Sequence, residues 1–189
     1  LENTILDSTG HLKLCDFGFC KENTTYDDQL NTFCGTKEYI APELITKKAF
    51  GYSMDWWCLG VFLFECLTSE LPFPNSKDDL ELYEKILYNT INFTKLMLST
   101  TVKNLMYNLL KKNPQERLGC TLDDGEDIKK HKFFAEYDWE DVFNKKIKPE
   151  FVPTLDGPGD TRFFNKQLLA APIVFSPTSE EVNYELQIE

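Results

Sequence analysis

The most apolar stretch of the chain runs from residue 52 to residue 67 and reads YSMDWWCLGVFLFECL. Apolar side chains fall on nearly every side of the helix that this stretch predicts, and such a helix has to be buried inside a domain. Ser53 is a candidate N-cap, and Asp55 adds negative charge to the first turn. The run is too short to span a membrane. It therefore predicts a mainly α-helical domain built around one central helix.

The overall charge and the cysteine count narrow the classes of function. The net charge of -11 disfavours nucleic acid and an anionic membrane as direct partners and favours basic partners, although acidity that serves only solubility is an equally good reading. The six cysteines form no Cys-x-x-Cys pair, and two histidines are too few for a zinc site. Free thiols indicate a reducing compartment, so we expect a cytoplasmic protein with no nucleic-acid partner and no direct membrane contact from this region.

Two short segments near the N-terminus predict a β-hairpin. Residues 4–7 and 12–15 read as strands, and the turn-forming sequence STGH joins them. Asn3 precedes the first strand and Asp16 follows the second, so the hairpin would bring both side chains to one end. Their oxygens are hard donors, as Mg²⁺ requires. The alternative is a capping Asn and a turn Asp that bind no ligand.

The order of the motifs around and after the hairpin indicates the class of protein. Asn3, the Asp-Phe-Gly triplet at 16–18 and the Ala-Pro-Glu triplet at 41–43 resemble the magnesium loop, activation segment and anchor of eukaryotic protein kinases. The resemblance implies transfer of the γ-phosphate of ATP to Ser or Thr of proteins, with ATP and Mg²⁺ as cofactors. It also implies that Asn3 and Asp16 are catalytic residues that bind the metal and thereby the cofactor.

The segment at 32–43 narrows the resemblance to the AGC group, the relatives of protein kinases A, B and C. Thr32 resembles the activation-loop phosphorylation site of that group, the target of an upstream activating kinase, where a phosphate would order the loop against Arg or Lys. Thr36 resembles the residue that supports the catalytic Asp and marks Ser/Thr specificity. Lys37 stands where the group usually has Pro, which puts the shape of the substrate loop in question but not the assignment.

Five positions match structural residues of the family. The Phe17 ring is expected to anchor its segment in the core, and Gly18 to let the backbone turn. Glu43 and Arg117 match a carboxylate–guanidinium pair that would clamp the activation segment to the helices as a buried ion pair. Asp55 matches a residue that tethers the catalytic-loop backbone, with a plain capping acid as the alternative.

Two acidic residues match a substrate-binding pair. Glu84, on an amphipathic helix predicted at 78–87, and Glu2 match the positions that hold a substrate Arg in protein kinase A, so the expected partners are protein substrates with basic residues near the phosphoacceptor. A solvated helix Glu is an equally weighted alternative for Glu84. Further helices are predicted at 102–112, before Asn-Pro, and at 128–134.

Proline and glycine mark an extended segment from about residue 147. The sequence DTRFFN at 160–165 resembles the AGC tail motif that wraps onto the active site, with Phe164 in the place of the adenine-contacting aromatic. Ser176 resembles the turn phosphorylation site of the tail. We therefore divide the chain into a partial kinase C-lobe, 1–134, and an AGC-kinase C-terminal tail, 135–189.

The printed residues contain no glycine-rich phosphate loop and no Val-Ala-x-Lys strand, and the catalytic Asp would stand five positions before Asn3. The expected fold is therefore a helical, kinase-like C-lobe with a small hairpin at the active-site edge and an extended tail, without the N-lobe. We expect residues 1–189 alone to be inactive. The alternative class of function is a non-catalytic pseudokinase or scaffold that serves as a binding module.

Overall fold

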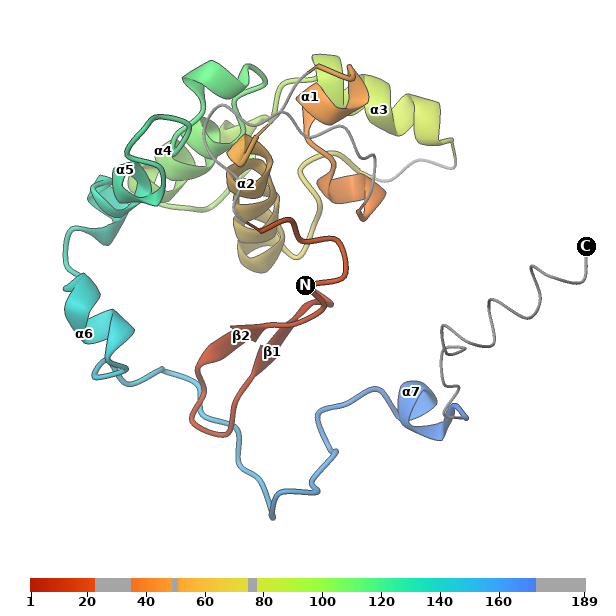
Figure 1. Ribbon diagram of the computed structural model, residues 1–189, viewed down its shortest axis with the longest axis vertical. Coiled ribbons are helices and arrows are strands. Elements are labelled where there is room, and N and C mark those ends of the chain that lie inside the picture. The colour runs from red at the N-terminus through yellow and green to blue at the C-terminus, as the bar shows by residue number, and fades with distance from the viewer. Residues whose placement is uncertain (23–34, 49–50, 75–77, 173–189) are drawn as a thin grey trace, which may run out of the picture.

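The computed structural model describes residues 1–22, 35–48, 51–74 and 78–172 (Figure 1). A two-stranded antiparallel sheet comes first, and the remaining regular elements of the described chain are helices. In order they are β1 (Thr4–Leu6), β2 (Leu12–Leu14), α1 (Pro42–Ile45), α2 (Ser53–Thr68), α3 (Asp79–Tyr88), α4 (Thr100–Leu109), α5 (Gly125–Lys129), α6 (Trp139–Phe143) and α7 (Lys166–Ala170). Short 3₁₀ turns lie at Lys37–Tyr39, Phe93–Lys95, Pro114–Glu116 and Lys132–Phe134. The expected mainly helical class with one small hairpin is confirmed.

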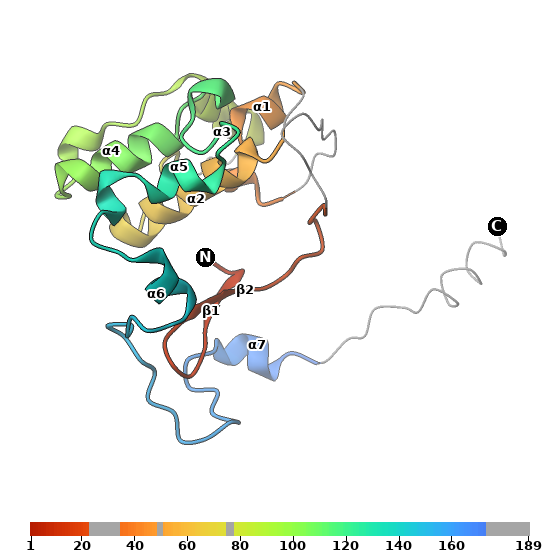
Figure 2. The same ribbon diagram turned by 60° about the vertical axis from the view of Figure 1, so that its left-hand side comes forward.

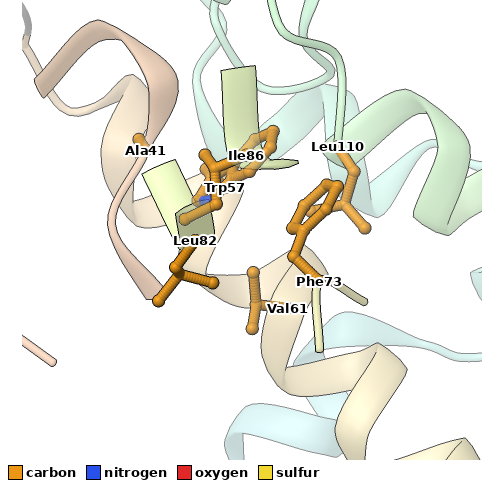
Figure 3. Packing of buried hydrophobic residues seen from close by; sticks show 7 residues of the cluster. All are labelled: Ala41, Trp57, Val61, Phe73, Leu82, Ile86 and Leu110. Carbon is orange, nitrogen blue, oxygen red and sulfur yellow. The ribbon is translucent and has the colours of Figure 1, made fainter. Parts of the chain in front are cut away.

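Helix α2 is the centre of the helical body because it packs on two sides. Trp57 and Val61 are fully buried in one cluster, which α3 and the segment after α2 complete (Figure 3); its buried members are Ala41, Trp57, Val61, Phe73, Leu82, Ile86 and Leu110. The opposite side of α2 packs on a second cluster of Leu105, Leu109 and Ile128 from α4 and α5. A Cβ added at Gly60 would lie 2.9 Å from Leu110 Cγ, so a glycine lets α2 and α4 approach closely.

Polar residues fix where the helices begin. The Asp78 carboxylate accepts a hydrogen bond from Leu80 N at 3.0 Å ahead of α3. The Ser99 hydroxyl accepts one from Val102 N at 3.2 Å ahead of α4. Both are N-caps that satisfy a free backbone donor. The expected N-cap at Ser53 is wrong, because α2 begins at Ser53 itself. The Ser53 hydroxyl donates instead to Glu43 Oε1 at 3.1 Å and so supplies a hydrogen bond to a buried carboxylate.

The hairpin lies at one edge of the helical body (Figure 1). Thr4 pairs with Leu14, Ile5 with Lys13 and Leu6 with Leu12. Leucines on the hairpin remain about half exposed or more, with Leu6 at 47% and Leu14 at 64%. A two-stranded ribbon is marginally stable in water by itself, so contacts at its ends matter for its shape.

The chain beyond α6 is extended and passes the tip of the hairpin (Figures 1 and 2). The five-residue helices α6 and α7 interrupt a segment that the sequence indicated only as tail. Asp138 caps α6 by accepting hydrogen bonds from Glu140 N and Asp141 N. Among the described helices, none combines the length and the apolar character needed to cross a bilayer.

Candidate functional site

The hairpin brings Asn3 and Asp16 to the same end. Cys15 N donates to Asn3 O at 3.0 Å, so the ladder extends one pair beyond the strands, and Asp16 is the next residue. Asp16 has φ +60°, in the left-handed region where few residues other than glycine are found. Its Oδ1 accepts a hydrogen bond from Gly18 N at 3.2 Å, which supports this backbone shape locally. The chain therefore turns sharply at Asp16, one residue beyond the pair of Asn3 and Cys15 at the end of the ladder.

The chain turns again directly after Asp16, which itself has the positive φ. Gly18 lies in a turn closed by the hydrogen bond from Cys20 N to Phe17 O at 3.1 Å, and a Cβ added at Gly18 would lie 3.2 Å from Asp16 Oδ1. The expectation for Phe17, in contrast, is wrong. Phe17 is 63% exposed and does not anchor its segment in the core, because no described element packs over its ring.

The donor chemistry of this end fits Mg²⁺ bound together with phosphate. The Asn3 amide and the Asp16 carboxylate offer hard oxygens, and Mg²⁺ sites of this kind use one or two protein ligands, substrate phosphates and water. Within the part of the chain that the structure describes, no cluster of three or more His, Cys, Asp or Glu side chains could hold a metal ion by itself. A Mg²⁺ ion held by Asn3 and Asp16 would therefore need further ligands from phosphate or water.

A buried ion pair lies inside the helical body. Arg117 Nη1 and Nη2 donate to Glu43 Oε1 and Oε2 at 2.6 and 2.8 Å, and the two residues are 2% and 3% exposed. The guanidinium also donates to Ser53 O at 2.7 Å and to Lys111 O at 3.1 Å. The bidentate pair joins α1 to the start of α2 and to the loop after α4, which is the geometry that the sequence indicated for a clamp.

The segment between residues 35 and 40 is tied to two helices. Lys37 Nζ forms an ion pair with Asp79 Oδ1 at 2.7 Å at the start of α3. The Tyr39 hydroxyl donates to Glu65 Oε2 on α2 at 2.5 Å, and burial together with this bond raises the pKa of Tyr39. The sequence predicted neither contact, although Lys37 departs from the family pattern at this position. Thr36 precedes this 3₁₀ turn and is exposed.

The remaining predicted side chains are on the surface. Glu2 and Glu84 are exposed, Glu84 on α3. Asp55 is exposed in the first turn of α2, where partial desolvation and then the Asp124 carboxylate raise its pKa. Phe164 is 58% exposed in the tail. Their roles toward substrate, catalytic loop and adenine stay predictions.

The two predicted phosphorylation sites, Thr32 and Ser176, lie outside the described residues. Their modification and its effect on the loop and the tail therefore stay predictions as well.

Comparison with known proteins identifies the family in which a hairpin with Asn3 and Asp16 lies beside a helical body. The family described as "Protein kinase domain" matches residues 1–134, and the chain belongs to this family. Among individual relatives, it is 39% identical over 180 residues to Serine/threonine-protein kinase N2 of Danio rerio. The match covers 95% of this chain and 18% of that protein, so the chain spans about a fifth of the relative's length.

Proposed function

We propose that the protein containing this chain is a serine/threonine protein kinase that transfers the γ-phosphate of ATP to proteins. The observation that carries the proposal is the convergence of Asn3 and Asp16 at one end of the hairpin, through the bond from Cys15 N to Asn3 O. Family membership and the similarity to a serine/threonine-protein kinase support the same reaction class.

In this proposal the hairpin supplies the protein ligands of the metal. The Asn3 amide oxygen and the Asp16 carboxylate would hold Mg²⁺, which when bound neutralises charge on the phosphate oxygens of ATP. The hydrogen bond from Gly18 N to Asp16 Oδ1 would fix the orientation of this carboxylate and leave Oδ2 for the metal. The Glu43–Arg117 pair keeps α1 fixed, so that the segment from Thr36 to α1 presents a defined surface to the protein substrate.

We further propose that the substrates carry basic residues near the phosphoacceptor. Two exposed carboxylates, Glu2 and Glu84, would attract guanidinium groups, and the net charge of -11 favours such partners. Thr32 would be phosphorylated by an upstream kinase and Ser176 within the tail, and Phe164 would contact adenine. A cytoplasmic location would suit these partners.

Residues 1–189 contain neither a glycine-rich loop nor the motif of the catalytic Asp. Catalysis of phosphoryl transfer rests on positioning and charge stabilisation, to which those parts contribute in the family. We therefore propose that residues 1–189 by themselves do not transfer phosphate at a measurable rate.

The test is transfer of radiolabelled γ-phosphate from ATP to a basic Ser/Thr peptide by the whole protein. Asp16→Asn removes the metal-binding charge while it keeps the side-chain shape, and it should lower kcat/KM at least about a hundredfold. Asp138→Asn is the matched control: it makes the same change at an N-cap, where Asn functions as well as Asp. An Asp16→Asn protein as active as the control would refute the proposed role of the hairpin.

A further inference from the structure

The turn of the hairpin is in contact with a distant part of the chain. Gly10 is buried and has φ +86°. A Cβ placed there would lie 2.2 Å from Phe151 O and 3.2 Å from Pro149 Cβ, so the backbone of the extended segment runs directly against the turn. This approach requires glycine because any Cβ would collide with Phe151 O, and the positive φ favours glycine as well. Figures 1 and 2 show the segment passing the tip of the hairpin.

A second contact joins the same two parts. Asp7 Oδ2 lies 3.5 Å from Lys145 Nζ, and the Asp7 side chain is 16% exposed. Asp7 Oδ1 at the same time accepts hydrogen bonds from Thr9 N and His11 N, each at 3.0 Å, and from Thr9 Oγ1 at 2.6 Å. One carboxylate therefore organises the turn with one oxygen and faces the lysine of the extended segment with the other.

The ladder connects this turn to the site. Asp7 N donates to His11 O at 2.9 Å next to the turn, three residue pairs follow, and Cys15 N donates to Asn3 O at the far end. With a rise of about 3.4 Å per residue, the turn and Asn3 are separated by roughly 14 Å of paired strand. The paired strands are therefore the direct hydrogen-bonded route between the turn and Asn3, and the exposed leucines add little packing that would hold the ribbon in place.

We propose that residues 145–151 are a positioning element for the hairpin, and that Gly10 and Lys145 are its positioning residues. The segment docks on the turn and thereby holds Asn3 and Asp16 at the opposite end. The docking itself is independent of the proposed function. Its consequence for metal binding rests on that function, since it assumes that Asn3 and Asp16 bind Mg²⁺ with ATP.

The test compares three variants of the whole protein. Gly10→Asn introduces a Cβ against Phe151 O while it tolerates the positive φ, because Asn is among the residues that adopt it most readily. Lys145→Gln removes the charge from the other side of the contact and leaves the turn sequence intact. Gly159→Ala is the control in the same tail, where an added Cβ meets nothing within 4 Å.

Amide hydrogen exchange is the first readout, because it needs no nucleotide. Gly10→Asn should speed exchange of amides within residues 145–151, which lose the turn that covers them, and of the Cys15 amide, which is bonded at the far end of the ladder, by roughly tenfold or more. Lys145→Gln should speed exchange of the same amides about two- to fivefold, as expected for the loss of a partly exposed ion pair. Gly159→Ala should match wild type.

The second readout is the Mg²⁺ concentration that half-saturates phosphoryl transfer. Gly10→Asn should raise it several-fold with a smaller change in the rate at saturating Mg²⁺, whereas a general loss of folded protein would lower the rate alone. Unchanged exchange at Cys15 in Gly10→Asn, or unchanged Mg²⁺ dependence in a protein whose tail has been released, would overturn the proposal. A wild type that transfers no phosphate refutes the proposed function instead, and the exchange data then decide whether the segment holds the Asn3 end.

Discussion

Removal of Arg117 should have the largest effect on stability of any single charge change in the described chain. Arg117→Met deletes four hydrogen bonds: two to Glu43, one to Ser53 O and one to Lys111 O. It also leaves the Glu43 carboxylate, which is 3% exposed, with the Ser53 hydroxyl as its donor. Breaking a buried ion pair at one partner lowers the free energy of unfolding by about 3–5 kcal/mol, since an uncompensated charge remains.

Two comparison variants test whether the buried charge causes this loss of stability. Lys37→Met breaks the Lys37–Asp79 ion pair, whose side chains are 39% and 55% exposed, and should lower the free energy of unfolding by at most about 1 kcal/mol. The double change Glu43→Leu with Arg117→Met removes both charges at once. It should recover most of the stability that Arg117→Met loses, because no buried charge is then left alone.

Urea unfolding followed by far-ultraviolet circular dichroism measures all four proteins, with the midpoint and the slope fitted separately. The burial argument requires Arg117→Met to be the least stable of the four by a clear margin. If Arg117→Met were no less stable than Lys37→Met, or if the double variant were as unstable as Arg117→Met, the desolvated charge would not be the source of the effect.

Three further predictions concern the helical body. Burial, and then the charge of Arg117, lowers the pKa of Lys112 to about 8. Between about pH 8 and 10 the unfolded state therefore binds more protons than the folded state, and the contribution of Lys112 to the free energy of unfolding becomes more favourable as the pH rises. Lys112→Met removes this titration together with the contacts of Lys112 Nζ to Ile86 O and to the Phe73 ring. The free energy of unfolding of the wild type, relative to that of Lys112→Met, should therefore be higher at pH 9.5 than at pH 7 in parallel urea titrations. Gly60→Ala should lower the free energy of unfolding by about 1–3 kcal/mol through overpacking, and the melting temperature with it, whereas Gly159→Ala should not. Burial raises the pKa of the Cys58 thiol to about 12, so maleimide should label exposed Cys20 well before Cys58 at pH 8, and equal rates would contradict the burial.

Sequence patterns predicted the helices and strands that a short run of neighbouring residues specifies. The apolar run at 52–67 predicted α2, and the helices predicted at 78–87 and 102–112 correspond to α3 and α4, whose observed starts lie within two residues of the predicted ones. The hairpin followed from two alternating segments and a turn. Helices α6 and α7 were missed because five residues are too few to show a helical period.

The errors at the site have a different origin, since they depend on what tertiary structure brings near. Ser53 had the composition of an N-cap, but the buried Glu43 carboxylate takes its hydroxyl. Phe17 is apolar, but whether an apolar ring is buried depends on which element covers it. The bond between Lys37 and Asp79 joins positions 42 apart, and no local pattern indicates a contact at that separation.

The spacing of the Glu43–Arg117 pair also bears on how the chain matures during translation. The two residues are 74 positions apart. At about 5–20 residues per second, a ribosome adds the arginine roughly 4–15 s after the glutamate. Throughout that interval the carboxylate has to remain hydrated, so α1 cannot settle in its final place. A nascent chain arrested before position 117 would thus present the apolar side of α1 to chaperones and proteases.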